Sequence, residues 1–449
     1  MSQHTRSALL ELDANHLIHP IHSRQAVASG HVWVRGEGAH LIDADGRVYV
    51  DGLSGLWNVF LGHGRKELAE AAAGQMETLG YASGYAGSTN PRAIELAGKL
   101  SELAYPSVNR FFLTSGGGES TDSCIKTARY FWKVRGKPTK TKVISRIWGY
   151  HGVTLAAMSA TGINTYWPMF EPRVPGFRHI GSPYPYFYEA PPGKTRGEAA
   201  ADELEAAILE EGPDTVAMFL AEPVQGAGGV IVPTDDYFPR IREICDRYDV
   251  LLVSDEVITG FGRTGTMFGL EHWGIEPDIM QFAKGITSGH IPLGGIGLSD
   301  RVAETLDAGG PIWMHAYTYS AHPVSCAVAL ANLGIIEREG LVAQAAAKGE
   351  ELIHNLEEAV GDHPHVGEVR GKGLMAAVEV VADRDTKALF PASEKVGPRL
   401  LKAVDDRGVF SRVRDAVFVC APPVCSTSED LAQIAAAVAG ALEEVTGRS

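Results

Sequence analysis

The chain has 449 residues and a formal net charge of −15, from 40 Lys and Arg against 55 Asp and Glu. Its length suits two or three domains with a large buried core. The acidic balance argues against nucleic acid and anionic membranes as partners, because phosphate surfaces attract the opposite charge. Any phosphate that this chain binds must be held by a few local amide groups and one or two cations.

The cysteines and the first residues bear on location and metal content. Five cysteines are few and odd in number, and none forms a C-x-x-C pair, so neither a disulfide framework nor a zinc site is expected. Residues 1–16 contain no apolar segment followed by a cleavage site, and the apolar stretch 431–442 is too short to span a bilayer. We therefore expect a cytoplasmic protein with no metal ion and no membrane segment.

The predicted elements indicate an α/β fold. Strands at 31–35, 39–43 and 47–51 flank a turn at Asp45-Gly46, which is typical of a hairpin. Helices then alternate with short apolar strands, a pattern typical of a mostly parallel sheet covered on both faces. The predicted helices are 91–103, 119–134, 201–211 and 236–248, and the predicted strands are 110–114, 142–145, 215–221 and 250–254. Beyond residue 330, two helical stretches, a strand region at 369–379 and a final amphipathic helix predict a smaller α+β domain, joined by the N-terminal hairpin.

Three glycines between a predicted strand and a predicted helix form the first candidate site. The run Thr114-Ser-Gly-Gly-Gly-Glu119 lets several backbone N–H groups point to one place beside a helix N-terminus. Such a place binds an anion, most simply a phosphate. A flexible turn explains the same glycines equally well.

An aspartate and a lysine form the second and third candidates. Asp255 follows the apolar strand 250–254, where α/β folds bind ligands, although a carboxylate there can also simply cap a turn. Lys284 lies between an apolar pair and a glycine; most lysines are only solvated, but burial disfavours the charged form and can produce a nucleophilic amine.

Together these three features match the needs of pyridoxal phosphate. The glycines would anchor the phosphate, Lys284 would form the Schiff base, and Asp255 would pair with the ring nitrogen. Other chemistries fit less well. Residues 260–265 satisfy G-x-G-x-x-G but no helix is predicted after them, and the chain contains neither a Walker A motif nor G-x-S-x-G.

Several motifs, in order across nearly the whole chain, resemble those of the class III aminotransferases. They are Gly149-Tyr-His-Gly152, Ala221-Glu-Pro-Val-Gln-Gly226, Leu252-Val-Ser-Asp-Glu-Val-Ile-Thr-Gly-Phe-Gly-Arg-Thr-Gly265, Ala283-Lys-Gly285 and Tyr317-Thr-Tyr-Ser320. The resemblance implies fold type I of the pyridoxal-phosphate enzymes and a homodimer or tetramer with active sites at an interface. Together with the pattern of elements, it predicts a large cofactor-binding domain at 66–330, with residues 1–65 and 331–449 forming the small domain.

The resemblance assigns roles to residues at the motif positions. Lys284 and Asp255 would be catalytic. The other cofactor-binding residues would be Gly117, Gly118, Tyr150, His151, Glu222, Gln225, Val257 and, from the neighbouring subunit, Thr318. Many members have Ser-Gly-Ser-Glu-Ala where this chain has Gly116-Gly-Gly-Glu-Ser120. The absent hydroxyl at Gly118 removes one phosphate hydrogen bond, worth about 1 kcal/mol, so we expect weaker retention of the cofactor.

The substrate pocket can be predicted on the same basis. Members that use 2-oxoglutarate often carry a glutamate where this chain has Ala227. Arg412 stands where pyruvate-dependent members keep a mobile arginine for the α-carboxylate, with Arg414 as the alternative. Trp57 and Tyr85 occupy positions that line the pocket with Tyr150, although either aromatic could equally be core filler.

These residues predict an aminotransferase that moves an amino group from an ω-amino acid or primary amine to pyruvate in a ping-pong reaction. Taurine, putrescine or 4-aminobutyrate with another oxo acid is the alternative. A mutase, an inactive binding protein with this fold and a nicotinamide dehydrogenase are the more distant ones. The amine donor, the stereochemistry and the choice between dimer and tetramer do not follow from the sequence.

Overall fold

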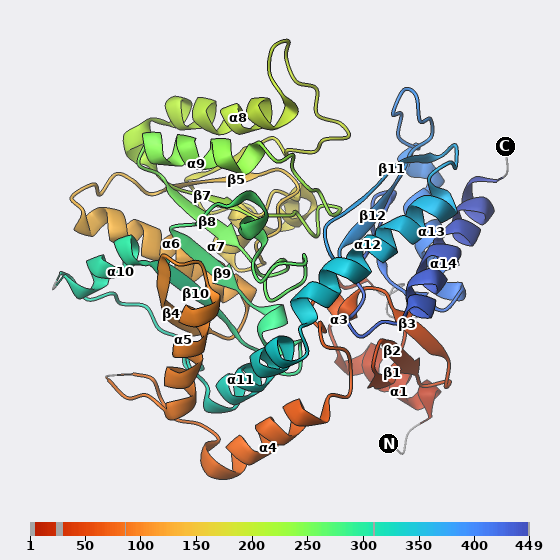
Figure 1. The fold of residues 1–449 in the computed structure, drawn as a ribbon, viewed down its shortest axis with the longest axis horizontal. Coiled ribbons are helices and arrows are strands. Elements are labelled where there is room, and N and C mark those ends of the chain that lie inside the picture. Colours follow the sequence, from red (N-terminus) through yellow and green to blue (C-terminus); the bar gives the residue numbers. More distant parts are fainter. Residues whose placement is uncertain (1–4, 24–29, 86, 309, 448–449) are drawn as a thin grey trace.

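The computed structural model describes residues 5–23, 30–85, 87–308 and 310–447. Residues 1–4 lie outside these ranges. They belong to the segment for which the sequence predicts no signal peptide. Figure 1 shows a large sheet with helices on both sides, and beside it a second unit that contains both ends of the described chain.

A seven-stranded sheet forms the centre of the large unit, in the order β4-β10-β9-β8-β7-β5-β6. Every neighbouring pair is parallel except those that include β10, which runs antiparallel to β4 and β9. The strands are β4 (Val108–Thr114), β5 (Lys142–Arg146), β6 (Phe177–Ile180), β7 (Val216–Ala221), β8 (Leu251–Asp255), β9 (Ile279–Phe282) and β10 (Gly294–Ser299). The prediction of a mostly parallel sheet in an α/β fold is confirmed.

Helices cover both faces of this sheet. Along β8, Leu251 and Val253 share one apolar cluster with Phe131 of α6, while Leu252 belongs to the opposite cluster with Ile244 of α9. The helices of this unit are α5 (Pro91–Leu103), α6 (Gly117–Val134), α7 (Leu155–Ala160), α8 (Arg196–Glu211), α9 (Tyr237–Arg247) and α10 (Asp300–Asp307). The alternation of side chains along a strand thus buries both faces, which explains the almost purely apolar strand sequences.

The second unit combines segments from the two ends of the chain. The hairpin predicted near the N-terminus is present, with β2 antiparallel to β3 and Gly46 in the left-handed region at φ 80°. Val50 of β3 pairs in parallel with Val409 of β13, so one small sheet contains strands from both ends. Figure 1 shows these red and blue segments side by side. The first sheet has β1 (Trp33–Glu37), β2 (His40–Asp43), β3 (Val48–Asp51) and β13 (Val409–Phe410); the second, antiparallel, has β11 (Val366–Gly371), β12 (Ala376–Val380), β15 (Val417–Cys420) and β14 (Arg412–Arg414).

The remaining described helices complete the two units. They are α1 (Arg6–His16), α3 (Ser54–Trp57), α4 (Lys66–Leu79), α11 (Pro323–Arg338), α12 (Leu341–Val360), α13 (Val396–Asp406) and α14 (Ser428–Thr446). The buried guanidinium of Arg263 joins the two units, since it donates to the carbonyl of Pro422 at 2.7 Å and to Ser54 Oγ at 3.0 Å. Among the described residues, no helix combines the length and the apolar character needed to cross a membrane. The domain boundaries at residues 65 and 330 stay a prediction.

Candidate active site

The glycine run lies at the N-terminus of α6, beside the carboxyl ends of the parallel strands. The helix begins at Gly117, and no side chain caps it. A Cβ at Gly117 would lie 3.3 Å from the Val257 methyl groups, and a Cβ at Gly152 would lie 2.9 Å from Cα of Gly118. Two other loops therefore approach this helix end closely, which only glycine permits, and leave its first N–H groups without a side-chain partner.

Asp255 is the last residue of β8 and is only 2% exposed. Its Oδ2 lies 2.7 Å from Nδ1 of His151, and its Oδ1 accepts the backbone N–H of Val257 at 3.1 Å. A carboxylate oxygen can accept more than one hydrogen bond, so both oxygens keep further capacity for a ligand.

The backbone of His151 is fixed from two sides. Its N–H donates to Thr161 Oγ1 at 2.9 Å, and its carbonyl accepts from Thr121 Oγ1 at 2.7 Å. Gln281 Nε2 in turn donates to Thr121 Oγ1 at 2.9 Å. These contacts hold the imidazole against Asp255 and so fix the direction of the carboxylate.

Glu222 and Gln225 follow β7 and bind the loop that carries Tyr150. Glu222 accepts the N–H of Tyr150 at 3.0 Å and that of Gly226 at 2.9 Å. Burial raises the pKa of this carboxyl, and the charge of Asp255 raises it too, against the opposing effect of His151. Gln225 Nε2 donates to the Ile147 carbonyl at 2.9 Å, and the whole side chain is buried.

Lys284 comes two residues after β9, with its backbone in the left-handed region at φ 45°. Desolvation lowers the pKa of its amine to about 8, although the carboxylates of Asp255 and Glu222 oppose this change; the charge of Arg412 adds to it. The lysine, the two carboxylates and Arg412 are therefore close enough to influence one another, and a large fraction of the amine is neutral near pH 8.

The two arginines of β14 have different surroundings. Arg412 lowers the pKa of both Lys284 and Tyr150, although burial, the larger effect, raises that of Tyr150. The guanidinium of Arg414 instead lies over the Trp148 ring, 4.3 Å from its centroid, and Nη1 donates to Asp415 at 2.7 Å. Arg412 is thus the arginine whose charge reaches the lysine.

The other predicted pocket residues are more dispersed. Trp57 is 2% exposed in α3, and the segment that follows contacts the turn after Lys284. Ala227 follows the glycine that donates to Glu222. Tyr85 is 53% exposed, and Thr318 is exposed on a segment whose carbonyl accepts from Tyr81 at 2.9 Å. Within the described part of this single chain, neither Tyr85 nor Thr318 makes a hydrogen bond, ion pair or ring contact with the residues around Lys284.

Sequence reasoning overlooked three side chains that hold this site in place. Thr121 and Gln281 support His151, and Ser182 Oγ donates to Oε1 of Gln225 at 2.6 Å. Gln281 was detectable, because an amide side chain within the apolar strand Ile279–Phe282 must find a buried partner. Thr121 and Ser182 carry no comparable signal.

The residues present fit pyridoxal phosphate. The uncapped end of α6 can bind the phosphate, Asp255 can accept a hydrogen bond from a protonated ring nitrogen, and Lys284 offers an amine of lowered pKa. The three features lie around one end of the sheet, as the carboxyl ends of neighbouring parallel strands require.

Comparison with known proteins adds the following findings. Residues 22–442 match the family described as aminotransferase class III. The chain is 42% identical over 429 residues to the diaminobutyrate–2-oxoglutarate transaminase of Halomonas elongata, covering 93% of this chain and 91% of that protein. It is 39% identical over 391 residues to the putrescine–pyruvate aminotransferase of Pseudomonas aeruginosa, covering 87% and 85%. A crystal structure of a thermostable (S)-enantioselective ω-transaminase from Thermomicrobium roseum matches with a TM-score of 0.95 at 47% identity, covering 99% of this chain and 100% of that one.

Proposed function

Because this chain belongs to the class III aminotransferases, a family that uses pyridoxal phosphate, we propose that it transfers an amino group from an ω-amino acid or a primary amine to pyruvate. The observation that carries this proposal is the position of Arg412. Its charge affects both Lys284 and Tyr150, and the sequence has Ala227, and not a glutamate, after Gly226.

The proposed roles follow from the contacts around the lysine. Pyridoxal phosphate supplies a ring that draws electron density from the substrate Cα when a proton leaves it. Lys284 takes that proton and later returns it, which its lowered pKa permits near neutral pH. Asp255, oriented by His151, holds the proton of the ring nitrogen in place.

Binding is divided among the remaining residues. The backbone N–H groups of Gly117 and Gly118 would bind the phosphate, and Tyr150 and Val257 would contact the ring. Glu222 fixes the backbone of Tyr150 and thereby the loop that carries the ring contact.

Arg412 would bind the carboxylate of the acceptor. A guanidinium binds a carboxylate through two parallel hydrogen bonds, so Arg412 would hold the α-carboxylate of pyruvate. Members that use 2-oxoglutarate often carry a glutamate at position 227, where it neutralises a substrate-binding arginine. This chain has Ala227 there, so no acidic side chain at that position would pair with the arginine when the acceptor has only one carboxylate.

One relative supports a second candidate activity. The Halomonas protein is named for 2-oxoglutarate, whereas the Pseudomonas protein is named for pyruvate, and the identities are similar at 42% and 39%. A diamine or 4-aminobutyrate donor with 2-oxoglutarate is therefore the alternative that the experiment has to exclude.

We propose further that the enzyme is a homodimer, with Thr318 and Tyr85 reaching the partner's site. Both residues are exposed, and large apolar side chains are exposed near them, at 79% for Ile312, 80% for Met314 and 60% for Tyr319. Exposed apolar clusters of this kind mark interfaces between subunits. A cytoplasmic location stays a prediction, supported by five cysteines that are all free.

Two measurements test this function. Borohydride reduction of the purified holoenzyme followed by peptide mapping should place the cofactor on Lys284, and Lys284→Ala should abolish the absorbance band of the lysine-linked cofactor. Labelling at another lysine would refute the assignment. Single-turnover reactions of the aminated enzyme with pyruvate and with 2-oxoglutarate should favour pyruvate, and Arg412→Gln should slow the reaction with pyruvate. A clear preference for 2-oxoglutarate would refute the acceptor while leaving the aminotransferase intact.

A further inference from the structure

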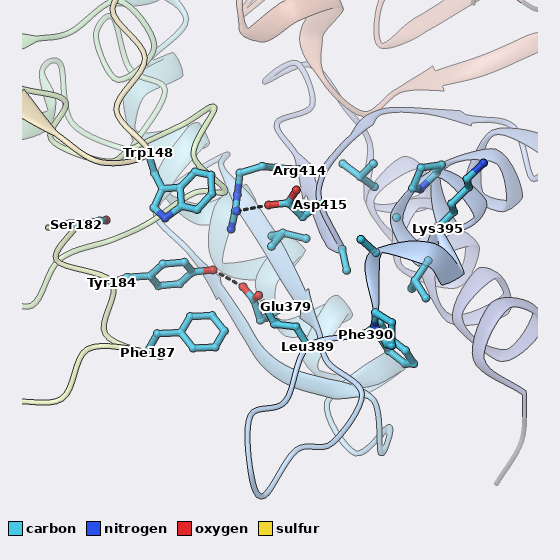
Figure 2. A pocket seen from close by; sticks show the side chains of 18 of the residues that line it. Trp148, Ser182, Tyr184, Phe187, Glu379, Leu389, Phe390, Lys395, Arg414 and Asp415 are labelled. Carbon is cyan, nitrogen blue, oxygen red and sulfur yellow. Dashed lines mark hydrogen bonds and ion pairs between the residues drawn. The ribbon is translucent and has the colours of Figure 1, made fainter. Parts of the chain in front are cut away.

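A large cavity lies beside the candidate active site; Lys284, Asp255 and Arg412 do not line it. Its volume is about 920 Å³, within the range of small-molecule sites. Figure 2 shows it between the large unit, where Trp148 follows β5 and Tyr184 and Phe187 follow β6, and the small unit, which contributes Leu389 and Phe390.

The walls of this cavity are mainly apolar and aromatic. Phe187, Phe390, Val413 and Val417 line it, and Leu389 is 60% exposed although it also faces the cavity. Exposed leucine at a concave apolar surface is the usual arrangement at the opening of a ligand pocket.

One cation in this cavity lacks a full set of partners. Arg414 Nε is buried and has no hydrogen-bond partner, while Nη1 donates to Asp415, whose side chain is 72% exposed. The guanidinium lies over the Trp148 ring, which shields one face of it from water. The buried Nε is closed to a ligand, but Nη2 is not buried and makes no hydrogen bond with the described residues, so an acceptor on a ligand could bind it.

Two acidic side chains line the cavity, and each is balanced by an arginine: Asp415 pairs with Arg414, and Glu379 pairs with Arg370. Glu379 is 2% exposed, accepts from Arg370 Nη1 at 2.9 Å, and also accepts a hydrogen bond from the Tyr184 hydroxyl. Its negative charge is therefore balanced by a second arginine. The exposed Lys395 adds a further positive charge to the lining. A carboxylate fits this cavity better than an amine.

We propose that this cavity is a second ligand site for a small carboxylate with an aromatic or branched apolar body, held by Arg414 and Trp148. The cavity does not include Lys284, but several residues that line it are close in sequence, or hydrogen-bonded, to residues of the candidate active site. Trp148 is two residues from Tyr150, Ser182 lines the cavity and donates to Gln225, and Arg414 is two residues from Arg412. A ligand here touches the elements that position the acceptor.

Calorimetric titration of the holoenzyme with 4-phenylbutyrate tests the proposal, with 4-phenylbutan-1-ol as the matched probe without charge. We expect the carboxylate to bind at least about tenfold more tightly than the alcohol. Arg414→Gln should weaken the binding of 4-phenylbutyrate by about tenfold or more, and so should Ala392→Trp, which fills the exposed side of the cavity.

The same titration on Arg412→Gln is the control. This variant should bind 4-phenylbutyrate as the wild type does while its KM for pyruvate rises, and Ala392→Trp should keep the wild-type KM. Absence of binding up to about 10 mM would overturn the proposal. It would also be overturned if Arg412→Gln abolished binding and the two cavity variants did not, because the probe would then occupy the catalytic pocket.

Discussion

In the cofactor-free protein, the Lys284 amine should be about 300-fold more often neutral at pH 7 than an ordinary lysine. Desolvation lowers its pKa from 10.5 to about 8. A shift of this size corresponds to about 3 kcal/mol between the two protonation states, and it raises the neutral fraction at pH 7 from about 0.03% to about 10%. Only the neutral amine is nucleophilic, so reactivity should rise with pH and level off above about 8.

Competitive acetylation with trace acetic anhydride, followed by peptide mass spectrometry, measures this titration directly. Lys66, whose side chain is 85% exposed, serves as the internal reference. Asp255→Asn should move the midpoint below that of the wild type, because the carboxylate raises the pKa of Lys284. Arg412→Gln should move it upward, because the guanidinium lowers that pKa. A wild-type midpoint near 10.5, or shifts of the same sign in both variants, would refute the reasoning.

Three further predictions concern cofactor retention and stability. Gly118→Ser should slow the loss of cofactor on dialysis by about fivefold, because the added hydroxyl can make one hydrogen bond of about 1 kcal/mol to the phosphate. The new Cβ would have only ordinary contacts, at 3.6 Å, so the substitution should not strain the helix. Faster loss of cofactor would contradict the proposed phosphate site. Gly295→Ala places a Cβ 2.5 Å from Phe282 Cζ and should lower the unfolding free energy in urea by about 1–3 kcal/mol, whereas Gly98→Ala, which meets nothing within 4 Å in α5, should not lower it. Lys140→Met should lower the unfolding free energy by about 3 kcal/mol in the same assay, because four backbone carbonyls would lose the ammonium group that donates hydrogen bonds to them. A decrease of less than about 1 kcal/mol would show that water replaces the ammonium group.

Periodicity predicted most of the large unit, and particular residues explain the exceptions. The helix Pro91–Leu103 has the predicted bounds, because Asn90 caps it and Pro91 occupies its first turn. Helix α8 begins at Arg196, five residues before the predicted start, because Thr195 and Glu198 form a capping box that precedes the apolar pattern.

Strand β10 went unpredicted because Gly294, Gly295 and Gly297 give it little strand propensity. The structure shows why glycine is needed there: Phe282 and Phe111 from the flanking strands occupy the space of the missing side chains. Such a constraint comes from strands distant in the sequence, so no local pattern reveals it. The family motifs, the α/β fold and the pyridoxal-phosphate cofactor were all predicted correctly from sequence.

The candidate site likewise contains residues that the sequence reveals and residues that only the structure reveals. Lys284, Asp255 and the glycines carry chemistry that a strand end or a helix start makes visible in the sequence. The Thr121–Gln281 support of His151 depends on a helix and a strand meeting in space. The different surroundings of Arg412 and Arg414, two residues apart on one strand, likewise appear only once Trp148 lies against the latter.

The parallel pairing of Val50 with Val409 has a consequence for the newly made chain. The N-terminal hairpin leaves the ribosome about 360 residues before the strand that completes its sheet. At usual rates of elongation this delay is roughly 20–70 s, during which the outer edge of β3 has no partner. Chaperone capture during synthesis should therefore concentrate on this edge and end when β13 emerges.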